Sequence, residues 1–313
     1  NPVAGTSDPN RLERLITQRF ESAGWSVEIH RTEENEGVPQ LVRNAVREEP
    51  DLVVAVGGDG TVSGVANGLV GTSVPLGIIP AGTGNVLARD LEIPLMPVRA
   101  LRLLIGPHEV RSIDALQFRD RNFFLNLSIG TSAAAMHDTE QREKRQFGFL
   151  AYISTGIQKL LGVQPASFTL EVDGRTHRVH ASDVIIANSG IIGVSALRLG
   201  DEISAYDGKM GICIIRARTA WHYGRLLWDA LLRRPQRDPR YHCLTATDRV
   251  IVKSDPELPV QGDGEAIGRG SLDVTIVPQA VQVIIGKPQP QIRLKLPSGE
   301  EIAEVLSRND DHD

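Results

Sequence analysis

This sequence is poor in aromatic side chains and has no excess of positive charge. Phenylalanine, tyrosine and tryptophan make up only 4% of the residues, and the formal net charge is −5. Proteins that bind nucleic acids usually gain affinity by neutralising phosphates with lysine and arginine. The acidic balance therefore argues against nucleic acid as a partner.

Cysteine is almost absent as well. The two cysteines, Cys213 and Cys243, lack CxxC spacing and have no histidine pattern beside them. Zinc sites and disulfide frameworks are recognised by such spacings. We therefore expect neither a zinc site nor a disulfide framework, and the sequence fits a reducing cytoplasm.

Long apolar runs and a leader-like start are also absent. No apolar run approaches the roughly 20 residues that span a bilayer, and no basic region followed by an apolar core opens the chain. We expect a cytoplasmic protein that is neither secreted nor integral to a membrane. The chain begins at Asn1-Pro2 without a methionine or a preceding strand, so we also expect a trimmed start.

The first part of the chain alternates helical patterns with apolar runs. Apolar spacing predicts helices over residues 10–24 and 38–48, and Trp25 to His30 predicts a short strand. Apolar runs at Leu52–Val56 and Pro75–Ile79 predict buried strands, each followed by a glycine-rich loop and a helix. This β-α-β-α order predicts a parallel sheet, with both loops at the carboxyl ends of the strands, where α/β proteins bind ligands.

From about Arg111 the pattern changes to short alternating runs separated by turn residues, which favours antiparallel strands. The runs lie at 121–126, 168–172, 184–187, 211–215, 249–253 and 273–277. Helices are expected near 147–161 and 220–233. We predict an antiparallel sandwich-like or barrel-like arrangement for this half of the chain.

These patterns divide the 313 residues into two domains, about the number expected for such a length. A single large α/β unit is the alternative. We predict an α/β domain over 1–122, a β-rich domain over 123–286 and a C-terminal segment over 287–313. That segment is expected to return partly to the first domain and to end in disordered polar residues.

The first glycine loop, Gly57-Gly58-Asp59-Gly60-Thr61, follows a buried strand and precedes a helix. Glycines let a backbone approach a phosphate closely, and the N–H groups at a helix start attract the anion. A carboxylate at Asp59 would repel a phosphate unless a magnesium ion lay between them. The alternative is a turn whose aspartate caps the helix.

The second loop, Pro80-Ala81-Gly82-Thr83-Gly84-Asn85, follows the next strand. Its Thr83 could donate a hydroxyl to a ligand, and Asn85 could fix the loop. Neither loop fits the GxGxxG fingerprint, and the chain has no GxxxxGK[ST] pattern. Dinucleotide-binding and P-loop interpretations are therefore disfavoured, and a different phosphate cradle is expected.

Taken together, four motifs resemble the diacylglycerol kinase catalytic domain family, which includes soluble bacterial lipid kinases and the sphingosine and ceramide kinases. The motifs are Asn1-Pro2-Val3-Ala4-Gly5, Gly57 to Thr61, Pro80 to Asn85 and Asp263-Gly264-Glu265. The first loop alone would also suit NAD kinases and phosphofructokinases. The order and spacing of the four, across nearly the whole chain, make the resemblance specific.

The resemblance implies a nucleotide-binding first domain of the NAD kinase and phosphofructokinase type, a lipid-binding second domain, and ATP and Mg²⁺ as cofactors. ATP is expected to lie between the domains. The residues implied to contact it are Asn1, Pro2, Gly5, Thr32, Gly57, Gly58, Asp59, Gly60, Thr61, Asn67, Gly82, Thr83 and Asn85.

The resemblance also implies that Asp263, Glu265 and Asp59 are catalytic. A positioned carboxylate can accept the proton of a substrate hydroxyl during phosphoryl transfer. We favour Glu265 as this base, with Asp263 orienting it or holding a metal-bound water, although the sequence does not separate the two. The alternative is an ordinary Asp-Gly turn on the surface.

A structural magnesium ion is implied at Ser204-Ala205-Tyr206-Asp207-Gly208-Lys209. The ligands would be the Asp207 carboxylate and the backbone carbonyls of Ser204 and Lys209, which suits a hard cation that keeps waters. A turn closed by Asp-Gly is an equal alternative.

Two positions depart from the family pattern. Thr6-Ser7 follows the first motif where a lysine or arginine is common, and Val86 follows Asn85 where an aspartate is common. Both departures concern nucleotide affinity and leave the reaction class as it is.

The lipid side is less distinctive. Segments 127–130, 148–152 and 186–190 resemble walls of the acceptor pocket, but core packing is the preferred explanation for their apolar residues. Residues 216–240 hold seven arginines and two of the three tryptophans. That mixture suits an interfacial helix that contacts a membrane surface, or equally a packed helix with a solvated basic face.

The sequence therefore predicts an ATP-dependent kinase of a lipid hydroxyl, with diacylglycerol giving phosphatidic acid as the first choice. An NAD kinase-like phosphotransferase and an inactive nucleotide-binding or lipid-binding protein on the same fold are the alternatives. The sequence leaves open whether the chain forms a homodimer.

Overall fold

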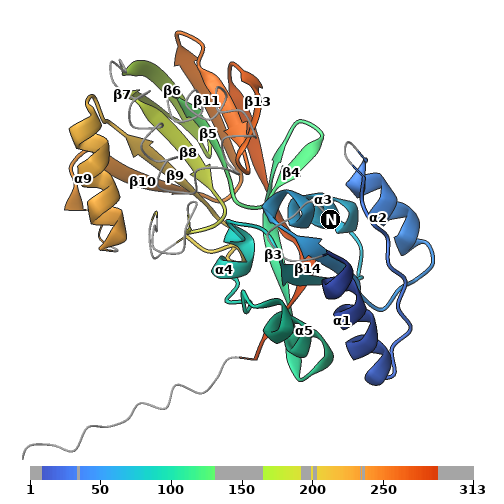
Figure 1. Cartoon of the computed structure of the whole chain (residues 1–313). Coiled ribbons are helices and arrows are strands. Elements are labelled where there is room, and N and C mark those ends of the chain that lie inside the picture. Colours follow the sequence, from blue (N-terminus) through green and yellow to red (C-terminus); the bar gives the residue numbers. More distant parts are fainter. Residues whose placement is uncertain are drawn as a thin grey trace, which may run out of the picture.

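The computed structural model of the chain describes residues 9–33, 36–130, 165–191, 199, 203–232, 234 and 237–287. The first motif at 1–5, the predicted helix at 147–161, the segment 148–152 and the C-terminal tail lie outside the described residues. Figure 1 shows the arrangement of the elements.

The elements of the first part are α1 (Pro9–Ser22), α2 (Val38–Val46), β1 (Val53–Gly57), α3 (Asp59–Leu69), β2 (Leu76–Pro80), α4 (Val86–Asp90), α5 (Pro97–Ile105), β3 (His108–Phe118) and β4 (Arg121–Phe123). The second part contains β5 (Asn126–Gly130), β6 (Ala166–Val172), β7 (Arg175–Ala181), β8 (Asp183–Ala187), β9 (Met210–Ile215), α9 (Ala220–Leu231), β10 (Tyr241–Ala246), β11 (Arg249–Asp255), β12 (Pro259–Gly262), β13 (Glu265–Arg269) and β14 (Leu272–Gly286).

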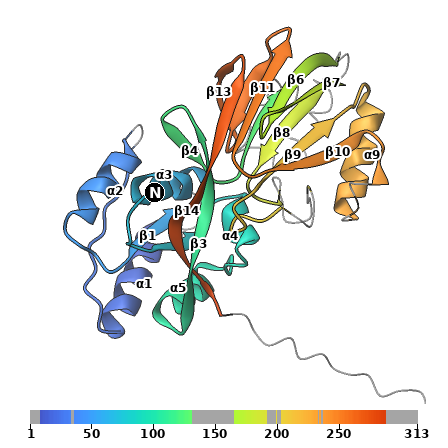
Figure 2. The ribbon, with the colours of Figure 1, turned by 180° about the vertical axis from the view of Figure 1, so that it is seen from behind.

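The predicted β-α-β-α order is confirmed, and β1 pairs with β2 in parallel. The α2–α3 pair and the α1–α5 pair lie on opposite sides of this sheet (Figures 1 and 2). The sheet is mixed rather than wholly parallel, because β14 joins β2 in parallel and β3 pairs antiparallel with β14. The antiparallel strand could not be anticipated from the local β-α-β pattern, since its partner comes from the far end of the chain.

The predicted strand at Trp25 to His30 is wrong. The segment has no regular structure, although Trp25 and Val27 pack against the first core. The rings of Trp25 and Phe20 form an edge-to-face pair with their centres 5.8 Å apart. These contacts produce the alternating apolar pattern without a neighbouring strand to complete a ladder.

The second half is a sandwich of two sheets. A six-stranded antiparallel sheet, in the order β10-β9-β8-β5-β12-β13, faces the outer part of an eight-stranded sheet that contains β3, β6, β11 and β14. Side chains from both sheets form one buried cluster, which includes Phe123, Phe168 and Leu170. The predicted antiparallel sandwich is confirmed.

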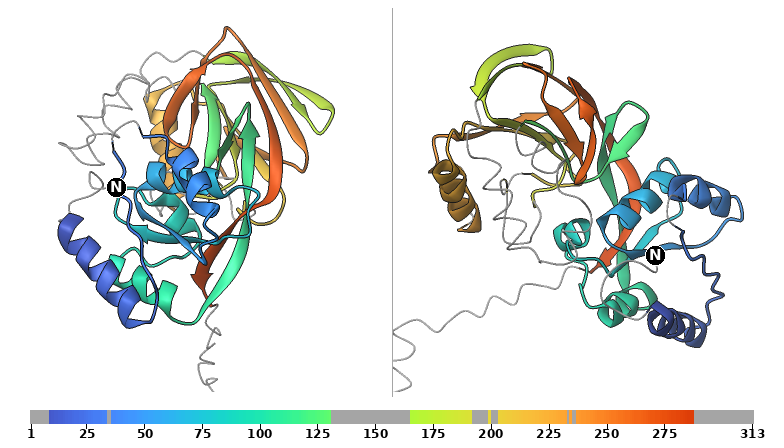
Figure 3. Two further views of the ribbon diagram at one scale, coloured as in Figure 1. Left: turned by 90° about the vertical axis from the view of Figure 1, so that its right-hand side faces the viewer. Right: turned by 45° about the horizontal axis from the view of Figure 1, so that its top comes forward.

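Strands β3 and β14 link the two halves (Figure 3). The first part of β14 pairs with β11 in the sandwich, and Val283 pairs with Leu76 of β2 in the α/β domain. Between Val277 and Val281 the pairing with β3 is interrupted, so three residues of β14 lie opposite Asp114 alone. Pro278 lies in this bulge, as expected for a residue with no N–H to give to a ladder.

The expectation that the cysteines would not pair is wrong, because Cys213 and Cys243 form a disulfide. They lie directly opposite each other on the antiparallel strands β9 and β10. Thirty positions separate them in the sequence, so no local spacing marks the pair. The bond lies in a small buried cluster with Leu226 of α9 and Tyr241, and it joins the edge strand β10 to the sheet.

Reduction of this disulfide should destabilise the protein. Closing a loop of this length restricts the unfolded chain, an effect of about 3 to 4 kcal/mol in the chain-entropy model. We expect a lower melting temperature with a reductant than without, measured by circular dichroism. The double variant Cys213→Ala, Cys243→Ala should melt at the same temperature in both conditions, and two free thiols in the unreduced, unfolded protein would contradict the bond.

Candidate active site

The two glycine loops touch each other at one edge of the first sheet. Because β1 and β2 are parallel and in register, both loops begin at the same edge, and the Ala81 N–H donates to the Gly57 carbonyl at 2.9 Å. A side chain on Gly82 would overlap the backbone of Gly58. Glycine is therefore required where the loops meet, which explains part of both motifs without a ligand.

Asp59 directs its carboxylate to the second loop. Its Oδ1 accepts the N–H of Val86 at 2.6 Å and that of Leu87 at 3.4 Å, which caps the start of α4. Burial raises the pKa of Asp59, and these backbone donors oppose the rise. The aspartate does cap a helix, but it is the following one, and this contact accounts for a carboxylate in a glycine loop. Its predicted catalytic role stays a prediction.

The start of α3 is left available by this arrangement. Gly58 precedes the helix, and no side chain in the described part of the chain caps it. Gly60, in the first turn, is exposed and has open space where a side chain would be. The first N–H groups of a helix lack partners within the helix, and they attract anions. The loop thus fits a phosphate group.

The second loop is held rigid by its own asparagine. The Oδ1 of Asn85 accepts the Gly82 N–H at 3.0 Å, and its Nδ2 donates to the Gly82 carbonyl at 2.8 Å. Asn85 has a positive φ of 50°. Thr83 lies between Gly82 and Asn85 and is exposed, so its hydroxyl is accessible to the predicted ligand.

Asn67 and Thr32, two further predicted nucleotide contacts, lie outside the two glycine loops. Asn67 exchanges hydrogen bonds with the backbone of Asn122, at 2.8 and 3.1 Å, and so ties α3 to β4. Thr32 is half-buried in the irregular segment before α2. Asn1, Pro2 and Gly5 lie outside the described residues. The ATP contacts of all five stay predictions.

The Asp263-Gly264 dipeptide forms the two-residue turn between β12 and β13. Both residues have positive φ, 47° and 83°, and the flanking Gly262 and Glu265 pair across the hairpin. Asp-Gly is the favoured sequence for such turns. The Gly264 N–H also donates to the Gln261 side chain at 3.0 Å, which secures the turn. The turn interpretation is therefore correct for the backbone. The side chain of Asp263, however, makes hydrogen bonds beyond the hairpin.

The Asp263 carboxylate joins the hairpin to the two domains. It accepts the N–H groups of Phe124, Leu125 and Asn126 at 2.9 to 3.1 Å, and the Ser63 hydroxyl donates to it at 3.2 Å. Ser63 lies on α3, one turn after Asp59. Burial raises the pKa of Asp263 to about 6, against the four hydrogen bonds, which favour the charged form. The Asp263-Gly264-Glu265 motif is thus docked on the helix that begins in the first glycine loop.

Glu265 is the accessible carboxylate of this motif. Its side chain is 59% exposed, and one oxygen forms an ion pair with Arg121 at 3.2 Å. The Arg121 guanidinium lies over the Phe123 ring, 5.1 Å from its centre, which limits the positions of the pair. Asp263 and Glu265 therefore differ in kind, since one is enclosed by donors and the other is open to solvent.

The structure adds residues that the motifs did not indicate. Ser63 and Arg121 hold the two carboxylates of the Asp263-Gly264-Glu265 motif. Asp114 forms a separate set of hydrogen bonds. Asp114 is 1% exposed, and its two oxygens accept the N–H of Gln279 at 2.8 Å and that of Gly208 at 2.7 Å. The only sequence signal for it was an aspartate between the apolar residues Ile113 and Ala115 of β3.

The predicted magnesium segment lies beside Asp114. The Asp207 Oδ1 accepts the Lys209 N–H at 3.0 Å, and partial burial together with the charge of Asp114 raises the pKa of Asp207. The Ser204 hydroxyl is buried and has no hydrogen-bond partner among the described residues. No group of three or more acidic, histidine or cysteine side chains that could hold a metal occurs within the described ranges. The two neighbouring carboxylates and the unpartnered hydroxyl fit a hard cation bound mainly by carbonyl oxygens and water.

Two predicted lipid-pocket segments belong largely to the core. Leu127, Ile129 and Ile186 lie in the buried cluster of the sandwich. The Asn188 amide donates to the carbonyls of Asp114 and Phe124, both at 2.9 Å. The core interpretation of these apolar residues is confirmed.

Both parts of the chain match known protein families. Residues 1–118 match the model of the diacylglycerol kinase catalytic domain, and residues 126–285 match the YegS C-terminal NAD kinase beta sandwich-like domain. A diacylglycerol kinase of Bacillus subtilis is 27% identical over 85% of this chain and 88% of its own. An uncharacterised protein of Synechocystis sp. is 28% identical over 90% of this chain and 68% of its own.

A solved structure supports the fold. The crystal structure of a diacylglycerol kinase from Bacillus anthracis superposes with a TM-score of 0.76 at 21% identity, covering 92% of this chain and 95% of the other. The matched models cover both domains, and both glycine loops and the Asp-Gly-Glu motif occupy the places described above. The chain therefore belongs to the diacylglycerol kinase catalytic domain family of lipid kinases.

Proposed function

We propose that the protein is an ATP-dependent kinase that transfers the γ-phosphoryl group to a hydroxyl of a membrane lipid, with diacylglycerol as acceptor and phosphatidic acid as product. The observation that carries this proposal is the hydrogen bond from Ser63 to Asp263. It fixes the Asp-Gly-Glu hairpin of the second domain against the helix that starts in the first glycine loop. This contact supports the proposal because it connects the candidate base to the candidate phosphate loop.

The phosphate side would be formed by the glycine loops. The N–H groups at the start of α3 and the exposed Thr83 would hold the triphosphate. ATP with Mg²⁺, when bound, supplies the phosphoryl group and neutralises part of its charge. Asp59 keeps the two loops in contact, so that the cradle is formed before a ligand arrives.

Glu265 is the better candidate for the base. Both oxygens of Asp263 are occupied by donors from the backbone and Ser63, so no lone pair is directed at a substrate. Glu265 is exposed and is held by Arg121. It would accept the proton of the lipid hydroxyl at a carboxylate oxygen, while Asp263 acts as a positioning residue.

Activity measurements on a panel of acceptors test this proposal. Purified protein with ATP and Mg²⁺ would be assayed with diacylglycerol, sphingosine, undecaprenol and NAD⁺. We expect phosphatidic acid from the wild type and a loss of about 10² to 10⁴ in turnover for Glu265→Gln, the range that general base catalysis contributes.

The control for Glu265→Gln is Asp273→Asn, which neutralises an exposed carboxylate paired with Arg249 elsewhere on the sandwich. It should keep the wild-type rate. Production of NADP⁺ would overturn the lipid assignment, and no product from any acceptor would favour a binding protein.

Asp263→Asn should change how stability depends on pH. The folded pKa of about 6 exceeds the ordinary value of 3.8, so the folded protein binds this proton more tightly than the unfolded chain. That stabilisation is complete below about pH 4 and is lost as the pH rises through about 6. Relative to Asp263→Asn, the wild type should therefore lose about 3 kcal/mol of unfolding free energy between these limits, at about 1.4 kcal/mol per pKa unit.

Urea unfolding at several pH values measures this difference. Ser63→Ala serves as the comparison, because it keeps the carboxylate and removes one donor that favours the charged form. Its loss of stability with rising pH should be larger than that of the wild type. A wild-type advantage over Asp263→Asn that grows with pH would show that the hydrogen bonds outweigh burial.

Magnesium should stabilise the protein through Asp207 even without nucleotide. Binding to the folded state alone raises the melting temperature. We expect Mg²⁺ to raise that of the wild type and to have a much smaller effect on Asp207→Asn. Asp248→Asn, a surface control, should respond as the wild type does, whereas an equal shift in all three proteins would contradict a site at Asp207.

A further inference from the structure

Helix α9 presents a second apolar face that no residue within the described ranges covers. Trp221, Trp228 and Leu232 are 77%, 61% and 51% exposed. With Arg225 they follow one another at intervals of four, three and four positions, which places all four on one side of the helix. These four residues are called the α9 outer face below. Single exposed apolar residues are ordinary, but two tryptophans and a leucine on one face are not.

The opposite side of α9 is anchored to the sandwich. Leu226 is buried in the cluster with the disulfide, and the Tyr223 hydroxyl donates to the Asp183 carboxylate at 2.8 Å. The Thr219 side chain accepts the His222 N–H at 3.3 Å and caps the start of the helix. The helix lies on the side of the sandwich away from α1 and α2 (Figures 1 and 2). The outer face is thus held rigidly at one end of the molecule.

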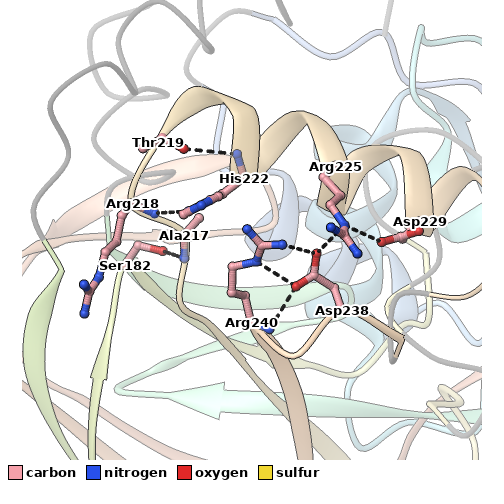
Figure 4. A network of polar contacts seen from close by, with 9 residues as sticks. All are labelled: Ser182, Ala217, Arg218, Thr219, His222, Arg225, Asp229, Asp238 and Arg240. Carbon is pink, nitrogen blue, oxygen red and sulfur yellow. Dashed lines mark hydrogen bonds and ion pairs between the residues drawn. The ribbon is translucent and has the colours of Figure 1, made fainter.

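Arginines precede and follow α9 in the sequence. The described residues of 216–240 contain six arginines and two aspartates, within a chain whose net charge is −5. Both aspartates are used internally: the buried Asp238 accepts hydrogen bonds from Arg240 and lies 3.5 Å from Arg225, and Asp229 lies 3.9 Å from Arg225 (Figure 4). Arg218, Arg234 and Arg237 are exposed. Exposed arginines therefore lie just before and just after the helix that carries the apolar face.

We propose that the α9 outer face docks the protein on the surface of an anionic lipid membrane. Tryptophan rings favour the boundary between headgroups and acyl chains, and arginines beside them are attracted to anionic headgroups. None of the described helices is long and apolar enough to cross a bilayer. The helix would lie in the plane of the interface with its outer face inserted.

The charge distribution favours a membrane over a second copy of the chain. In a two-fold dimer formed through this face, each Arg225 and its neighbouring arginines would oppose the same arginines of the other copy. An anionic surface meets the same residues with opposite charge. The inference goes beyond the proposed reaction, because docking requires neither ATP nor an acceptor.

Vesicle binding tests the inference without any measurement of turnover. The full chain would be sedimented with phosphatidylcholine vesicles and with vesicles that also contain phosphatidylglycerol. We expect binding to the mixed vesicles alone, weakened by salt. In a Trp25→Phe background, which leaves Trp221 and Trp228 as the fluorescent residues, binding should shift the emission to shorter wavelength.

Two pairs of substitutions separate the apolar and the charged contributions. Trp221→Ala with Trp228→Ala should reduce partitioning at least about tenfold, since both side chains would enter the interface. Arg218→Glu with Arg234→Glu should abolish the preference for anionic vesicles. The matched control is Arg175→Glu with Arg178→Glu, which makes the same change of charge at exposed positions of β7 and should bind as the wild type does.

The positions substituted in these test and control pairs are exposed, so melting temperatures should stay within a few degrees of the wild type. Wild-type binding by the tryptophan variant, or equal loss in the β7 control, would overturn the proposal. A wild-type dimer in analytical ultracentrifugation that the tryptophan substitutions dissociate would also overturn it, because the face would then be a protein interface. Vesicle binding without kinase activity would support docking and count against the proposed reaction alone.

Discussion

The structure depends on one constraint: β3 and β14 must belong to both domains at once. The same β14 pairs with β11 in the sandwich and with β2 in the α/β sheet, and β3 follows it along most of its length. The bulge opposite Asp114 interrupts the ladder between these two parts. The Gln279 N–H in this bulge has no partner in the ladder and donates to one oxygen of Asp114 instead. The other oxygen of Asp114 accepts the Gly208 N–H. A buried carboxylate thus completes the backbone hydrogen bonding at the junction of the domains.

Asp59 and Asp263 act by the same principle at the candidate site. Each is partly buried and accepts backbone N–H groups from a segment distant in the sequence, Asp59 at the start of α4 and Asp263 at residues 124–126. Burying a carboxylate is costly, and charged hydrogen bonds from several donors offset that cost. Glu265 lacks such enclosure and keeps an accessible oxygen. Acidic residues that look alike in the motifs thus divide into those that hold the site together and one that could react.

Much of the fold followed from local patterns. Continuous apolar runs and glycine loops predicted β1, α3 and β2, because a parallel strand buried on both faces and its turn are encoded within about a dozen residues. Alternating runs predicted the strands of the sandwich, because this pattern is also contained within a short segment. The segment at Trp25 misled because packing against a core produces alternation even where no strand lies alongside. Prediction failed most clearly for the cysteines, whose pairing depends on the register of β9 and β10.

By itself, the sequence determined the family motifs, the two-domain order and the residue types available for phosphoryl transfer, since these are properties of short segments. Only the tertiary structure decided which carboxylates are enclosed, that Cys213 and Cys243 meet, and that the tryptophans of α9 face outward. Ser63 and Asp263 lie 200 positions apart, and no local pattern signals that their side chains touch. Burial and long-range hydrogen bonding arise when sheets assemble, and these determine whether an aspartate supports the site or acts in it.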